Sequence, residues 1–304
     1  MPFEGVYSII PTAFTASGDF DLDSQRKVVD LFIEKGANGL TALGVTGEVA
    51  RLEEHERATV LEAVVRQVDG RVPIVAGTSA DGTRTCISYT RQAKAIGASA
   101  VMVSPPRMPK LNSNAVVAHY KALAEAVDLP IVVQDYPPIT GFAMEPALLA
   151  RIAKEIPSAR TIKLEDPPTP FKTARILEAC AGTPVQIFGG LGGVFLLEEL
   201  ISGATGAMTG FAFPEILARI MKHWNAGERD AAADVFYRAV PLMRFEFQEG
   251  IGMAIRKEVL RRRGVLATAT LRGPAGALDK PTTEALDRVL AWVTSQKGME
   301  WISV

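Results

Sequence analysis

Eight short apolar runs, rich in β-branched residues, recur along this chain, and longer segments of helical periodicity separate them. This alternation predicts parallel strands joined by crossover helices. The runs begin 21 to 34 residues apart, which leaves room for one strand, one helix and two short loops. They are Val6–Ile10, Gly39–Leu43, Pro73–Ala76, Ala100–Val103, Pro130–Val133, Thr161–Leu164, Val185–Phe188 and Gly206–Thr209.

Eight units of this kind close into a (β/α)8 barrel. We therefore predict an α/β protein, with a (β/α)8 TIM barrel over residues 1–226 and one helix in each connection. Residues 227–304 contain no further strand signal and are predicted to form a C-terminal three-helix extension packed on the barrel. Its helices are predicted over Glu228–Phe245, Glu249–Arg263 and Thr282–Gln296, with the Gly-Pro-rich segment Arg272–Leu278 as a linker.

The composition narrows the possible functions. Hydrophobic residues make up 48% of the 304 residues, so a large core is available. The 33 Lys and Arg nearly balance the 34 Asp and Glu, and a net charge of -1 gives little support for binding nucleic acid. The sequence has no uninterrupted apolar run of about 18 residues, so we expect no membrane span.

Cysteines and histidines indicate neither a disulfide framework nor a metal site. Cys86 and Cys180 form no Cys-x-x-Cys pair, which favours a reducing, cytoplasmic location. His55, His119 and His223 fall in predicted helices and have no metal-ligand spacing. The first residues, up to Gly18, lack a basic start followed by an apolar run, so we expect no signal peptide.

The sixth run carries the strongest chemical signal. Reactive groups of such barrels gather at the carboxyl ends of the strands. Alternation along Thr161–Glu165 puts Lys163 and Glu165 on the same face, opposite Ile162 and Leu164. A lysine amine in an apolar barrel interior loses hydration of its charged form and becomes a nucleophile that attacks ketones. Glu165 is then a candidate base or proton shuttle, although a purely structural Lys-Glu pair fits this strand equally well.

Two glycine-containing loops also follow predicted strands. Gly44–Glu48 offers free N–H groups and a Thr hydroxyl, which suit a carboxylate, but an ordinary strand-to-helix connection has the same composition. Gly189–Gly193 follows the seventh run, where many barrels bind phosphate. Phe195 stands in place of the last glycine of a dinucleotide-binding pattern, so we predict a close-packed loop that roofs the pocket.

Together with Lys163, these segments resemble the dihydrodipicolinate synthase/N-acetylneuraminate lyase family of class I aldolases. The resemblance extends in order and spacing over the whole predicted barrel and includes the helical tail. The matching pieces are Gly44–Glu48, Ala76–Thr78, Asp128–Pro130, Pro137, Thr140–Gly141 and Ile162–Glu165.

The resemblance implies a pyruvate-like 2-keto acid held as an iminium on Lys163, with no metal and no organic cofactor. It implies that Thr46, with the Val45 and Thr46 amides, holds the substrate carboxylate, and that the assembly is a homotetramer. The residues expected around the substrate are Val45, Thr46, Gly47, Tyr136, Gly189 and Met208.

Departures from the family pattern fall on residues that separate one activity from another. Val45 replaces a hydroxyl residue, and Gln134 aligns with the tyrosine that ends the fifth strand in most members. The tyrosine of the synthase relay is missing from Ser104–Met108, and Ile139 replaces the arginine that holds the aldehyde substrate of the synthase. Gln134 cannot act as an acid or base, so the synthase relay is absent. Tyr136, two residues on, can substitute if it shares a strand face with Gln134, or it is a packed aromatic at the rim.

With the relay absent, Glu165 becomes the ionisable group nearest the iminium carbon, and Gln134 is expected to orient the keto acid or a substrate hydroxyl. An enamine from a 2-keto-3-deoxy sugar acid can expel its C4 hydroxyl or undergo carbon–carbon cleavage. The pairing of Gln134 with Lys163 and Glu165 looks most like the dehydratase branch, of the 2-keto-3-deoxyarabonate type. The alternatives are a sugar-acid aldolase, 4-hydroxy-tetrahydrodipicolinate synthase, and a non-catalytic barrel that binds keto acids.

Overall fold

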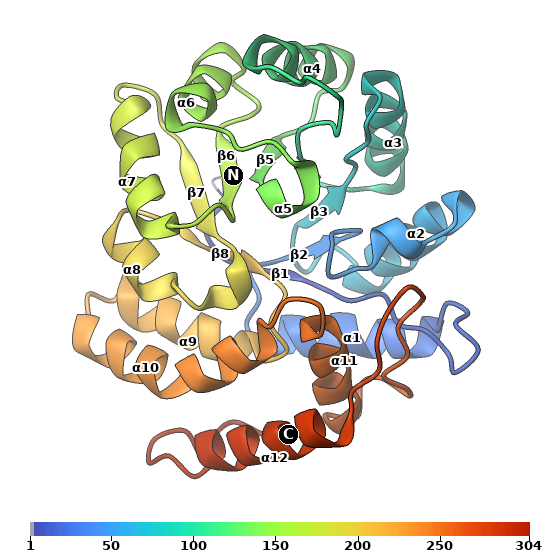
Figure 1. The fold of residues 1–304 in the computed structure, drawn as a ribbon, viewed down its shortest axis with the longest axis vertical. Helices are drawn as coiled ribbons and strands as arrows, with labels where there is room; N and C mark the ends of the chain where they lie inside the picture. The colour runs from blue at the N-terminus through green and yellow to red at the C-terminus, as the bar shows by residue number, and fades with distance from the viewer. Residues whose placement is uncertain (1–2) are drawn as a thin grey trace.

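The computed structural model describes residues 3–304 and contains a closed barrel of eight parallel strands, each paired with its sequence neighbours (Figure 1). The last strand pairs with the first and closes the ring. The eight predicted strands are all confirmed, to within two residues at each end. They are β1 Gly5–Ile9, β2 Gly39–Ala42, β3 Ile74–Gly77, β4 Ala100–Val103, β5 Ile131–Asp135, β6 Thr161–Leu164, β7 Gln186–Gly189 and β8 Gly206–Thr209.

Helices surround the barrel and cover the outer face of its strands (Figure 1). They are α1 Leu22–Glu34, α2 Glu54–Val68, α3 Thr83–Ile96, α4 Ser113–Ala126, α5 Pro137–Thr140, α6 Pro146–Glu155, α7 Thr169–Ala179, α8 Leu196–Ile201 and α9 Pro214–Asn225. The prediction of one helix per connection is wrong between β5 and β6, where α5 precedes α6. Pro137 and Pro138 favour a helix start there, and Gly141, with a φ of 68°, ends the helix after one turn.

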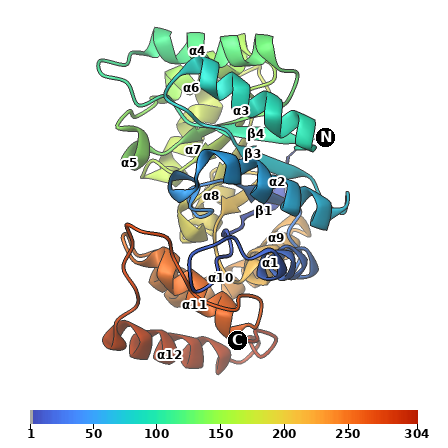
Figure 2. The same cartoon turned by 90° about the vertical axis from the view of Figure 1, so that its right-hand side faces the viewer.

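Three further helices follow the barrel, as predicted: α10 Arg229–Glu246, α11 Gly252–Arg262 and α12 Lys280–Thr294. They lie together on one side of the barrel, with α11 and α12 at its outer edge (Figure 2). The third helix begins two residues earlier than predicted because Asp279 caps it and accepts a hydrogen bond from the Thr282 amide. α11 lies against the segment after β1, where Lys257 Nζ stands 4.3 Å from the centroid of the Phe14 ring.

The core has two layers. The outer layer lies between strands and helices and includes the buried faces of α10, α11 and α12. The inner layer fills the barrel itself with Phe3, Tyr7, Ile9, Val75, Ala100, Met102, Val132, Phe188 and Met208. Tyr7 and Phe188 meet edge to face at 5.4 Å between ring centroids. The barrel is therefore a packed core and not an open channel.

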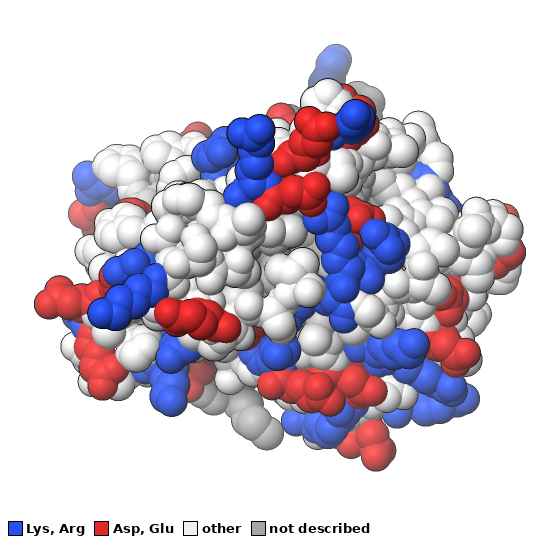
Figure 3. Space-filling model, turned by 90° about the horizontal axis from the view of Figure 1, so that it is seen from below, with Lys and Arg blue, Asp and Glu red and all other residues white. Residues whose placement is uncertain are grey.

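Charged side chains are dispersed over the surface. On the side of α12, viewed from below in Figure 3, acidic and basic residues alternate and neither sign forms a continuous field. Among the described residues, no helix combines the length and apolar character needed to cross a membrane.

Candidate active site

Lys163 and Gln134 lie side by side inside the barrel because they are register partners on β6 and β5. Lys163 is 2% exposed and Gln134 4%. Glu165 follows β6, and its Oε2 atom lies 2.6 Å from Lys163 Nζ. Gln134 Nε2 donates a hydrogen bond to the same oxygen at 2.8 Å. The structure thus brings the three residues predicted to be catalytic into one buried, hydrogen-bonded cluster.

Glu165 reaches this position because Gly190 leaves room for it. A Cβ atom at residue 190 would lie 2.3 Å from Glu165 Cγ, closer than side-chain atoms can approach. A Cβ atom at Gly192 would lie 2.9 Å from Phe247 Cβ. The loop after β7 is therefore close-packed, as predicted, and it covers the carboxylate from one side.

The orientation of the Gln134 amide follows from its partner. A carboxylate in an ion pair can only accept hydrogen bonds, so Gln134 presents its NH2 group to Glu165. The amide oxygen of Gln134 stays available for a donor such as a substrate hydroxyl. Gln134 therefore holds Glu165 on one side and can contact a ligand on the other.

Tyr136 lies at the junction of β5 and α5, and whether it shares a face with Gln134 stays a prediction. β5 ends at Asp135, and Tyr136 stands at the start of α5, where the backbone has left the strand. Its side chain is half-buried. Burial raises the pKa of Tyr136, and the negative charges of Glu165 and Glu249 raise it further. The phenol is consequently a weaker acid than a free tyrosine, and its contact with substrate stays a prediction.

The loop Gly44–Glu48 after β2 is fixed by an ion-paired acid at its end. Glu48 has a left-handed backbone, with φ 55°, and its side chain is completely buried. Lys257 Nζ of α11 lies 2.5 Å from Glu48 Oε1, and Arg51 Nη1 lies 3.1 Å from Glu48 Oε2. The Arg272 amide also donates to Oε2, at 3.1 Å. Residues of the C-terminal extension therefore hold Glu48, the last residue of this loop, in place.

Thr46 is held from the same helix. Arg256 Nη1 donates to Thr46 Oγ1 at 3.2 Å, and Arg256 Nε donates to Glu246 Oε1 at 2.6 Å. Because Thr46 Oγ1 accepts from Arg256, its own O–H remains free to donate to a ligand. Within residues 3–304, the amide N–H groups of Val45 and Thr46 also donate to no protein acceptor. These donors suit a carboxylate, the role predicted for the loop.

Sequence reasoning missed Arg256 and Lys257. Both belong to a predicted helix and look like ordinary solvated basic residues, yet they are 7% and 2% exposed. The local pattern carries no signal for partners more than 200 residues away, which only the packing of α11 reveals. Gly47 accepts a hydrogen bond from the Thr12 hydroxyl at its carbonyl oxygen, at 2.6 Å, and its predicted contact with substrate stays a prediction.

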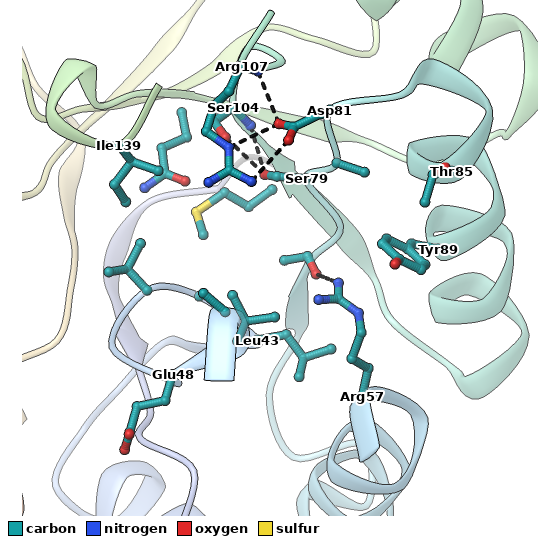
Figure 4. A pocket seen from close by; sticks show the side chains of 18 of the residues that line it. Leu43, Glu48, Arg57, Ser79, Asp81, Thr85, Tyr89, Ser104, Arg107 and Ile139 are labelled. Carbon is teal, nitrogen blue, oxygen red and sulfur yellow. Dashed lines mark hydrogen bonds and ion pairs between the residues drawn. The ribbon is translucent and has the colours of Figure 1, made fainter. Parts of the chain in front are cut away.

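A pocket of about 650 Å³ opens at the barrel mouth, and Gln134, Val45 and Ile139 are among its lining residues (Figure 4). Val45 is 42% exposed, whereas Lys163 and Glu165 are not among the lining residues. Gln134, which neighbours both, is the member of the reactive cluster that meets the cavity.

The lining of the pocket combines apolar residues with hydroxyl groups and several charged side chains. Ser104 Oγ donates to Ser79 Oγ at 3.1 Å. Arg107 is engaged by Asp81 through two side-chain hydrogen bonds of 3.0 Å, and Figure 4 shows it turned toward that carboxylate. Arg57 extends from α2 and donates to the Gly77 carbonyl at 3.1 Å. The guanidinium of Arg107 is thus paired with a carboxylate, whereas that of Arg57 contacts a backbone carbonyl.

Gly189 and Met208, both predicted to lie around the substrate, have closely packed surroundings. A Cβ atom at residue 189 would lie 1.6 Å from Glu199 Oε2 of α8. Any other residue there would therefore point its side chain away from the barrel interior and into α8. Met208 is completely buried within the inner core of the barrel. Their contact with a ligand stays a prediction.

An eight-stranded barrel with a buried lysine beside a carboxylate at the end of its sixth strand belongs to the class of lyases that work through a covalent imine. The chain belongs to the dihydrodipicolinate synthetase family, whose model matches residues 2–292. It is accordingly a Schiff-base-forming lyase of that family.

Individual relatives span more than one activity. The chain is 31% identical to L-2-keto-3-deoxyarabonate dehydratase of Azospirillum brasilense over 93% of this chain and 92% of the relative. It is 32% identical to 4-hydroxy-tetrahydrodipicolinate synthase of Nitratidesulfovibrio vulgaris over 82% and 85% of the two chains. The crystal structure of dihydrodipicolinate synthase from Rhodopseudomonas palustris superposes with a TM-score of 0.90 at 32% identity, covering 95% of this chain and 97% of that one.

Proposed function

We propose that this lyase dehydrates a 2-keto-3-deoxy sugar acid, of the 2-keto-3-deoxyarabonate type, through an iminium on Lys163. The observation that carries the proposal is the 2.6 Å contact between Lys163 Nζ and Glu165 Oε2 in a buried site. One carboxylate beside the reacting amine can accept and return every proton that the reaction moves. The similarity to a keto-deoxy sugar acid dehydratase over 93% of the chain supports the choice of substrate class.

The first stage forms the iminium. Glu165 accepts a proton from the Lys163 ammonium, and the neutral amine attacks the C2 carbonyl of the substrate. Glu165 then returns the proton to the C2 hydroxyl of the carbinolamine, which leaves as water while the carbon–nitrogen double bond forms. The Thr46 hydroxyl and the free amides of the Gly44–Glu48 loop hold the substrate carboxylate.

The second stage eliminates the C4 hydroxyl. Glu165 removes a proton from C3, and the electron pair of that C–H bond forms the enamine. The enamine expels the C4 hydroxyl, which takes the proton from Glu165 and departs as water. Hydrolysis of the resulting conjugated iminium frees Lys163. Gln134 anchors Glu165 with its NH2 group, and its amide oxygen orients a substrate hydroxyl.

The departures from the synthase pattern favour elimination over condensation. At the position of the synthase arginine stands Ile139, and Arg107 is paired with Asp81, so neither residue offers a free cation to an aldehyde carboxylate. Serine hydroxyls line the same cavity and suit the hydroxyl groups of a sugar acid.

The decisive experiment incubates the protein with pyruvate and borohydride, and mass spectrometry locates the reduced adduct. An adduct on Lys163 is expected. Turnover of 2-keto-3-deoxy acids is then followed by loss of water and by release of pyruvate. Loss of water supports the dehydratase, release of pyruvate indicates an aldolase, and condensation of pyruvate with aspartate semialdehyde indicates the synthase.

An adduct without any turnover would instead indicate a barrel that only binds keto acids, and no adduct with pyruvate or sugar acids would overturn the imine mechanism. The homotetramer remains a proposal that rests on the family resemblance, and sedimentation of the purified protein tests it.

A further inference from the structure

One ammonium on the outer side of β5 and β6 joins two carboxylates. Lys172 Nζ of α7 lies 2.6 Å from Asp135 Oδ2 and 2.6 Å from Asp166 Oδ2. The Lys172 and Asp135 side chains are buried, and Asp166 is partly exposed. Asp135 directly follows Gln134, and Asp166 directly follows Glu165. Lys172 therefore ties together the two chain segments that carry the proposed proton-transfer groups.

The backbone joins these segments at the same level. The Glu165 amide donates to the Asp135 carbonyl at 2.9 Å, one residue beyond the end of β6. Inside the barrel, Gln134 Nε2 reaches Glu165 Oε2 across this junction. Asp135 faces α7, whereas its neighbour Gln134 faces the interior, as strand alternation requires. Lys172 therefore contacts the outer side of the β5 and β6 ends, and Lys163 lies on the inner side of the same strands.

The two outer carboxylates depend on that ammonium. Burial raises the pKa of Asp135 to about 6, and the Asp166 charge adds to the increase, whereas Lys172 opposes it. Without Lys172, the pKa of Asp135 would rise further, and the charged bridge that holds Asp135 and Asp166 together would be lost. A displacement there passes directly to Glu165 through the chain.

We propose that Lys172 is a positioning residue for proton transfer, which fixes Glu165 against Lys163 and Gln134 by holding Asp135 and Asp166 together. The inference rests on the proposed function, since it assigns a role to the environment of Glu165. Proton transfer is sensitive to displacements of about 1 Å, which can cost about 100-fold in rate. Imine formation also uses Glu165, but trapping after equilibration counts the imine that has formed and does not depend on how fast its protons move.

The test separates these two steps in Lys172→Met, Lys172→Arg and wild type. Borohydride trapping with pyruvate counts the lysines that form the imine. Exchange of the pyruvate C3 protons with deuterium from solvent, followed by NMR, measures the proton transfer per trapped lysine. Lys172→Met should keep trapping within about threefold and lower exchange by about 10- to 100-fold. Lys172→Arg should recover much of the exchange, because a guanidinium can also bridge two carboxylates.

The matched control is Arg263→Met, which breaks another ion pair with little exposed surface, to Glu215, on the side of α9 and α11. It should lower the thermal stability comparably but leave exchange per trapped lysine unchanged. If Lys172→Met does not fold, Asp166→Asn provides the same test, because it releases the segment after Glu165 while the Lys172–Asp135 pair stays neutral overall. Its exchange should fall about fivefold.

If the folded variant has the same exchange rate per trapped lysine as wild type, the positioning role is overturned. Trapping and exchange that fall together would overturn it as well, because the effect would not be specific to proton transfer. A wild-type protein that forms no adduct contradicts the proposed function instead, so the two failures are distinguishable.

Discussion

The two halves of the candidate site are held in different ways. The chemical half consists of Gln134, Lys163 and Glu165, whose contacts join residues 31 and 2 positions apart in the chain. The binding half is the Gly44–Glu48 loop, whose Thr46 contacts Arg256 across 210 positions. Adjacent strands therefore build the reactive cluster, whereas the C-terminal extension fixes the loop predicted to hold the substrate carboxylate.

The residues proposed to react and the loop predicted to bind substrate thus depend on different parts of the fold. Residues of the chemical half are set by barrel register, which every (β/α)8 chain must satisfy in order to close. The binding half depends on the packing of α11, which is an addition to the barrel. Changes in the chemical half should therefore act on kcat and changes in the extension on KM.

The largest effect should come from Lys163→Ala. The imine cannot form without the amine, so turnover of a 2-keto-3-deoxy acid should fall by more than about 10³-fold. The barrel should remain folded, because its closure rests on the strand pairs and the two core layers. Steady-state kinetics and circular dichroism measure the two results. Turnover at the wild-type rate would contradict the assignment of the nucleophile.

A smaller effect should follow Arg256→Lys. The new ammonium can still pair with Glu246 but cannot also reach Thr46, so one hydrogen bond of about 1 kcal/mol is lost at the carboxylate loop. KM for the keto acid should rise about fivefold, with kcat within about twofold of wild type. A fall in kcat at constant KM would show that the extension takes part in the reaction and would remove the distinction between the two halves.

The smallest effect concerns Glu199 of α8, which should make the folding stability depend on pH. Burial raises the pKa of Glu199 to about 8, with the Glu198 and Glu165 charges adding to the increase and a hydrogen bond from Thr169 opposing it. The folded protein thus keeps a proton there between pH 4.5 and 8 that the unfolded chain releases, so its stability falls as the pH rises through this interval.

Glu199→Gln is neutral in both states and removes this dependence. Its Tm should exceed that of wild type by on the order of 5 °C at pH 8, and the difference should shrink toward pH 5. Activity should change little, since Glu199 lies on the outer side of β7 against Gly189. Calorimetry at both pH values provides the check, and an equal Tm difference at pH 5 and pH 8 contradicts the assignment of the proton.

Much of this architecture could be read from the sequence because it depends on local periodicity. The eight strands follow from apolar runs, and the contact between Lys163 and Glu165 follows from their spacing of two residues. The short helix α5 after Tyr136 was not predicted, because its single turn is too short to show a helical period. The partners of Thr46, Glu48 and Asp135 could not be found either, since Arg256, Lys257 and Lys172 look like exposed helix residues until packing buries them.

The ion pair between Glu48 and Lys257 also has a consequence for biosynthesis. The ribosome releases residues 134–190, and with them the reactive cluster and the loop that covers it, well before residue 257. Until α11 emerges, the Glu48 carboxylate has Arg51 as its ion-pair partner and lacks both Lys257 and the Arg272 amide. The nascent enzyme therefore acquires its nucleophile first and completes the loop for substrate recognition last.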